Sequence, residues 1–184
     1  KIKEKKGIFF TFISIIIMII FIIIFTPPAD VSLQRDTKAV KFRIGSIDKY
    51  VSSLENSYFE AILRSSSHKA ILSLIFYMNS TGLYLTDLDS AFYEVIMNGT
   101  INKEPIDSYT NKQIMENNTI TNWTNRIINA SKDTLDVDTT VTINNVSLLQ
   151  TKPWEIDVIL NVSFSVKANV AEWKKDKKVR IVID

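Results

Sequence analysis

The sequence predicts an α+β protein in which an N-terminal transmembrane helix, a long amphipathic helix and shorter helices precede a C-terminal antiparallel β-meander. Three patterns predict this plan: a charge-free apolar run, a period of about 3.5 residues after it, and strict alternation near the C-terminus. We divide the chain into a basic segment with the transmembrane helix (1–29), a helical stalk with the helical part of an ectodomain (30–132), and a sheet part (133–184).

Residues 7–25, GIFFTFISIIIMIIFIIIF, contain ten isoleucines and no charged side chain. As a helix they would be about 28 Å long, which matches the hydrocarbon core of a bilayer. Lys1, Lys3, Lys5 and Lys6 precede the run, and the positive-inside bias then keeps the N-terminus in the cytoplasm. We therefore expect a single-pass protein of the cell membrane, surrounded there by membrane lipid, with an extracellular C-terminal domain.

A cleavable secretory signal is the alternative for this run. Its apolar core is normally about 7–15 residues long and ends at small residues. Here the core is longer and is followed by Thr26-Pro27-Pro28-Ala29, so an uncleaved signal anchor is favoured.

The segment after the apolar run has one face that repeats in steps of four and three residues from Leu33 to Ala61. Two interpretations stay open, a coiled coil between copies of the chain and an amphipathic helix on the protein's own sheet. Gly45 and the run Ser65–His68 interrupt the stripe, and residues 64–78 favour the second interpretation because they are too apolar to face water. The candidate self-association stripe consists of Val40, Ile44, Ile47, Val51, Leu54 and Tyr58.

Capping residues predict where the shorter helices begin and end. Asn79-Ser80-Thr81-Gly82 is a helix stop followed by a turn. Thr86 or Asp87 then caps a short helix over residues 88–97.

The following segment, residues 100–118, is polar, contains a proline and is predicted to be a surface loop. Thr119 or Thr121 begins another helix, which ends near residues 129–132.

Alternating residues predict the strands. Residues 137–148 form a strand with a possible bulge at Asn144-Asn145, and residues 154–168 form a second, long strand. Residues 173–178 are predicted as a hairpin turn and residues 179–183 as the return strand, which leaves a sheet edge open to another copy or to a continuation of the chain.

Half of the fourteen asparagines begin an Asn-x-Ser/Thr sequon, which is an acceptor for glycans on the exposed surface of an exported protein. None of the sequons precedes residue 79, so we expect a glycosylated outer half above an N-terminal packing face. The candidate glycosylation sites are Asn79, Asn98, Asn117, Asn122, Asn129, Asn145 and Asn161.

The sequence predicts no catalytic, cofactor-binding or metal site. It has no cysteine and only four glycines. Asp133, Asp136 and Asp138 lie close together but lack the glycine and the final glutamate of a calcium-binding EF-hand loop. His68 is the single histidine, and a catalytic triad or metal site needs partners for it. The formal charge of +2 is too small to indicate a nucleic-acid partner.

The order of Lys5-Lys6-Gly7, an apolar helix, an amphipathic continuation and a C-terminal antiparallel sheet resembles the archaeal type IV pilin-like surface proteins. The resemblance implies that a membrane peptidase cuts between Gly7 and Ile8 and that the apolar helix then forms the core of a filament. Phe12 departs from the pattern, because bacterial pilins have a glutamate at this position.

We therefore expect a non-enzymatic, membrane-anchored structural or adhesive surface protein. It would assemble through its N-terminal helix into a homo-oligomer or filament, or attach to cell-envelope proteins. The alternative is a single-pass anchored binding or accessory protein of a cell-envelope, secretion or motility machine.

Overall fold

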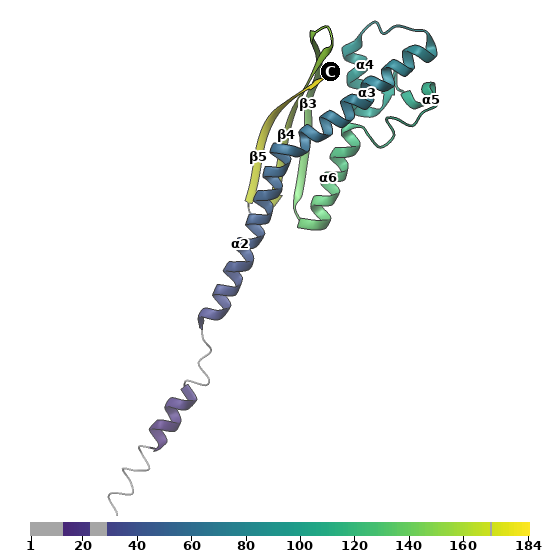
Figure 1. Cartoon of the computed structure of the whole chain (residues 1–184). Helices are drawn as coiled ribbons and strands as arrows, with labels where there is room; N and C mark the ends of the chain where they lie inside the picture. The colour runs from purple at the N-terminus through teal and green to yellow at the C-terminus, as the bar shows by residue number, and fades with distance from the viewer. Residues whose placement is uncertain (1–12, 23–28, 170) are drawn as a thin grey trace, which may run out of the picture. The chain divides into compact units, whose positions relative to one another are not determined.

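The computed structural model describes residues 13–22, 29–169 and 171–184 (Figure 1). The chain separates into two compact units, Lys1–Ser46 (unit 1) and Ile47–Asp184 (unit 2). Unit 2 contains both helices and strands, and its sheets are antiparallel, which confirms the α+β class. The division predicted between residues 132 and 133 is not a boundary between these units, because the helices before it and the strands after it share one core.

The structure contradicts the transmembrane helix expected over residues 7–25. The described part of that run, residues 13–22, is one helix of about 15 Å, half of what a bilayer core requires. No helix in the described ranges is long and apolar enough to cross a membrane. The single-pass topology, the membrane localisation and the signal anchor are therefore wrong for the described chain, because crossing a bilayer needs a helix of about 20 apolar residues and no described helix meets this requirement. The rest of the run, residues 7–12 and 23–25, lies outside the described residues.

The second described range begins with three helical elements: α2 (Ala29–Ser53), the π-helix η1 (Leu54–Tyr58) and α3 (Phe59–Thr81). The predicted stop after Asn79 is confirmed. Gly82 has φ 68°, a left-handed conformation that costs glycine little, and its N–H donates to the carbonyl oxygen of Met78.

The two predicted capping positions are also confirmed. Asp87 caps α4 (Leu88–Asn98) by accepting a hydrogen bond from the N–H of Ser90. Thr119 caps α6 (Ile120–Leu135) in the same way, and α6 runs three residues past its predicted end.

The predicted surface loop at residues 100–118 contains regular structure that its polar composition concealed. A two-residue pair, β1 (Thr100–Ile101) with β2 (Glu104–Pro105), is followed by the short helix α5 (Ile106–Thr110). Ile101 and Ile106 are buried and anchor this segment.

The large sheet has the order β3-β4-β5, with β3 (Asp138–Lys152), β4 (Glu155–Ala168) and β5 (Ala171–Ile183). The register shifts between Ile143 and Asn145, which confirms the bulge. The hairpin turn predicted at residues 173–178 is wrong, because β4 and β5 already pair from Ala168 and Ala171 onward. A run of lysines is solvated equally well on an edge strand and in a turn, so composition could not separate the two.

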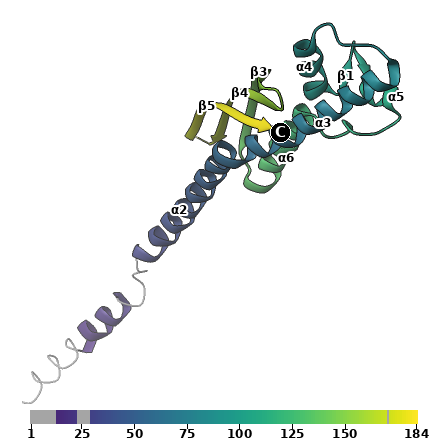
Figure 2. The ribbon, with the colours of Figure 1, turned by 45° about the horizontal axis from the view of Figure 1, so that its top comes forward.

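Helix α3 and one face of β4 form the core of unit 2. The side chains of β4 that alternate onto this face are all buried: Val158, Leu160, Val162, Phe164 and Val166. The ring of Phe59, at the start of α3, lies 5.4 Å from that of Phe164 between centroids. Figures 1 and 2 show α3 extending beyond the sheet to α4 and α5, so the packed helix also carries the segment that follows it.

Phe59→Ala should lower the free energy of unfolding by about 3–5 kcal/mol, because it removes a large side chain that is 2% exposed and leaves a cavity. Phe42→Ala is the matched control. Phe42 is 79% exposed, and its loss should change stability by less than about 0.5 kcal/mol. Urea denaturation followed by circular dichroism measures both, and equal effects would contradict this description of the core.

Candidate self-association site

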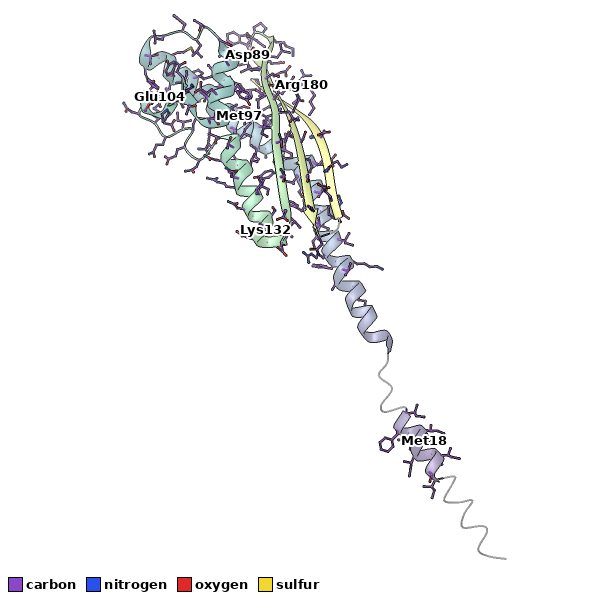
Figure 3. The ribbon with its side chains drawn as sticks, turned by 180° about the vertical axis from the view of Figure 1, so that it is seen from behind. Met18, Asp89, Met97, Glu104, Lys132 and Arg180 are labelled. Atoms are coloured by element: carbon purple, nitrogen blue, oxygen red, sulfur yellow. The ribbon has the colours of Figure 1, made fainter. Side chains whose placement is uncertain are left out.

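The helix at residues 13–22 exposes apolar side chains on every face. Its nine large apolar residues are between 38% (Ile13) and 66% (Met18) exposed, and Ser14 is its single polar residue. Successive residues are about 100° apart, so ten residues cover the whole circumference. Figure 3 draws these side chains, with Met18 labelled. Each gains about 1.5–3 kcal/mol on full burial, so this surface favours an apolar partner.

The predicted self-association stripe is exposed in its first part and buried in the core of unit 2 in its second part. Val40 and Ile44 are exposed, at 57% and 47%. Ile47, Val51 and Leu54 are at most 5% exposed and belong to the core of unit 2. The second half of the stripe therefore packs inside its own fold and is not available to another copy.

Tyr58, the last stripe residue, is half-buried and makes a specific contact. Its hydroxyl donates a hydrogen bond of 3.0 Å to the backbone carbonyl of Trp123 on α6. Burial raises the pKa of this hydroxyl, Tyr50 raises it further, and Arg126 partly opposes the shift. The hydroxyl therefore stays protonated and acts as a structural donor.

The structure also places the seven sequon asparagines. Asn122 and Asn161 are half-buried, and Asn161 lies directly opposite Asn145 across β3 and β4. The exposed ones are Asn79, Asn98, Asn117, Asn129 and Asn145. Their glycosylation stays a prediction.

A cleft of about 440 Å³ lies beside α4 and α5, and three sequon asparagines line it: Asn98, Asn117 and Asn122. Asp107, in the same wall, accepts hydrogen bonds of 3.0–3.2 Å from the N–H groups of Ile114, Met115 and Glu116. This carboxylate thus holds the irregular backbone before α6 in place.

Glu94, a residue of α4, likewise holds irregular backbone in place. It accepts hydrogen bonds from the hydroxyl of Thr100 and from the N–H groups of Asn102 and Lys103, at 2.6–3.1 Å. Partial burial raises the pKa of this carboxyl, but the three hydrogen bonds and the charge of Lys103 outweigh burial, and the net shift is downward. Asn102 and Lys103 have positive φ, so Glu94 stabilises a turn that these residues adopt at a cost.

A second cleft, of about 320 Å³, places Tyr77 and Tyr84 near the carboxylates of Asp87 and Glu94. Both carboxylates already bind groups of their own chain, Asp87 through the N–H and hydroxyl of Ser90. These carboxylate oxygens therefore stabilise the fold through hydrogen bonds within the chain.

The residues considered for catalysis or metal binding do not converge. His68 is exposed on α3. Lys132 forms ion pairs with Asp136 and Asp138, at 3.3 and 3.0 Å. In the described part of the chain, no three His, Cys, Asp or Glu side chains are grouped to hold a metal ion.

The sequence pattern does not predict the buried carboxylate of Asp157. Asp157 lies on the face of β4 opposite the core, where alternation predicts an exposed side chain, yet it is 1% exposed. Arg180 on β5 donates to it at 2.6 Å, and this bond raises the pKa of the guanidinium. No local pattern signals the pair, because its members are 23 residues apart.

Comparison of the chain with protein-family models, with curated proteins and with solved structures gives no match. Its function therefore has to be inferred from its own residues.

Glu94→Ala should lower the free energy of unfolding by about 1–2 kcal/mol at pH 7, because three donors lose a charged acceptor. The folded-state pKa of Glu94 is depressed. The contribution is therefore fully present above the carboxyl's unfolded value and disappears as the pH falls through the folded one.

Urea denaturation of both chains between pH 7 and pH 3 measures this difference. Glu104→Ala is the control, since Glu104 is exposed. A difference between wild type and Glu94→Ala that stays constant down to pH 3 would contradict the assigned role.

Proposed function

We propose that this protein is a non-enzymatic structural subunit that assembles with copies of itself through its N-terminal apolar helix, as pilin-like proteins do. The exposed apolar surface of residues 13–22 carries the proposal. A helix that is apolar all round is stable in water only when neighbours cover every face. Identical helices from several copies provide such neighbours, and a bundle of them leaves no apolar face in water.

The order of elements supports a pilin-like subunit over an unrelated assembly. An apolar helix comes first, a long helix follows, and the latter part of that helix packs on an antiparallel sheet. Val40 and Ile44 on α2 are also exposed and add apolar surface for contact between copies. Ile47, Val51 and Leu54 do not contribute to it.

Assembly should be lost in the chain that carries both Ile16→Asp and Ile20→Asp. These residues lie one turn apart on the helix, and burying two carboxylates in an apolar bundle is strongly unfavourable. Negative-stain electron microscopy and sedimentation velocity of the purified full chain measure the outcome. The matched control, Ile16→Leu with Ile20→Leu, keeps the surface apolar and should assemble.

The proposal is contradicted if the double aspartate chain assembles as well as wild type does. Urea denaturation separates loss of assembly from misfolding, since unit 2 should unfold at the same urea concentration in all three chains.

The pilin-like proposal also includes cleavage between Gly7 and Ile8, which lie outside the described residues. The native protein should then begin at Ile8, which N-terminal sequencing or mass spectrometry of material from its own cells detects. A native chain that retains Lys1–Gly7 would contradict processing of the pilin type but not assembly through the helix.

A further inference from the structure

Residues 82–118, here called the acidic lobe, contain α4, β1, β2 and α5. The acidic lobe has six carboxylates and two lysines, a net charge of −4. None of the six forms an ion pair with a described residue. Asp89, Glu104 and Glu116 are exposed, and Figure 3 labels Asp89 and Glu104 in this part of unit 2. Unneutralised charge of one sign attracts a surface of the other sign.

The complementary surface is the first half of β5, Glu172–Lys178, here called the lysine edge. It contains four lysines and two acidic residues on an edge strand of the sheet. Lys174 and Lys178 are exposed. Lys174 forms an ion pair with Glu172 of the same strand at 3.3 Å, and Lys175 forms one with Glu55 at 3.7 Å. Lysines on an edge strand oppose backbone pairing with another strand, so contacts here are made by charged side chains.

Acidic residues near the lysine edge cancel only part of its charge, because the four lysines outnumber Glu172, Asp176 and the neighbouring Glu55. Asp133 lies in α6, Asp136 follows that helix, and Asp138 is the first residue of β3, which is the other edge of the sheet. Two strand spacings separate the edges, about 10 Å, which is about one Debye length at 0.1 M salt. Lys132 also pairs with two of these carboxylates.

The acidic lobe and the lysine edge cannot meet within one copy. Figures 1 and 2 both show the beginning of β5 on one side of unit 2 and the α4–α5 segment on the other. Each surface is therefore free to face a neighbour.

We propose that the acidic lobe of one copy docks on the lysine edge of a second copy. Two different surfaces at separate ends of unit 2 make a heterologous contact, which leaves each pair with one free surface of each kind and so repeats along an open chain. This inference rests on the proposed function, because exposed charge pairs are individually weak and become effective when apolar helices already hold the copies together.

Charge exchange in the full chain tests the contact. Reversal in the acidic lobe (Asp89→Lys with Glu104→Lys) and reversal on the lysine edge (Lys174→Glu with Lys178→Glu) should each raise the critical concentration for assembly about tenfold in 50 mM salt. The chain with all four substitutions restores opposite charges and should assemble like wild type. In 500 mM salt the differences should shrink, because screening weakens exposed pairs.

The matched control reverses two exposed acidic residues outside the acidic lobe, Asp48→Lys with Glu60→Lys, and changes the net charge equally. It should leave the critical concentration unchanged. The contact is overturned if the control raises it as much as the lobe reversal does, or if the fourfold exchange fails to restore assembly.

Sedimentation equilibrium of the Ile16→Asp, Ile20→Asp chain separates this inference from the proposed function. The docking contact predicts weak association of this chain at high concentration, which disappears in 500 mM salt and on charge reversal at either surface. A strictly monomeric chain in 50 mM salt overturns the docking contact. Loss of assembly through the apolar helix is judged independently, from the comparison with the leucine control.

Discussion

The burial of one face of β4 beneath α3 is the contact on which the rest of unit 2 depends. β4 is the central strand, and five of its side chains face the helix without exposure above 3%. Ser66, Ser67 and Ala70 of α3 are fully buried, and the hydroxyl of Ser66 donates to the carbonyl of Asn118, just before α6, at 2.8 Å. Because α3 is longer than this contact, it also positions α4 and α5.

The parts of the chain that α3 positions are held by polar bonds as well as by buried apolar side chains. Asp107 and Glu94 each bind three donors in the segment between α4 and α6. Both carboxylates belong to the acidic lobe, so residues that order its backbone also count toward its net charge of −4. The same residues thus account for a local structure and for a surface property.

Local signals were sufficient wherever neighbouring residues decide the structure. The end of α3 at Gly82, the cap of α4 at Asp87 and the bulge near Asn145 all depend on a few adjacent residues, and all were predicted. Alternation likewise predicted β4, as a long strand over residues 154–168. The β1, β2 and α5 elements were not predicted, because their stability comes from Glu94 and from buried isoleucines, and polar residues dominate the segment.

The sequence by itself determined the α+β class, the buried face of β4 and the apolar character of residues 13–22, because side-chain hydropathy and its period are local properties. Tertiary structure alone decided how the stripe is used. Ile47 and Leu54 follow the same period as Val40, yet they enter the core while Val40 stays exposed. A helical period predicts that one face of the helix will be buried. Which turns of that face are covered depends on where the sheet and the neighbouring helices lie.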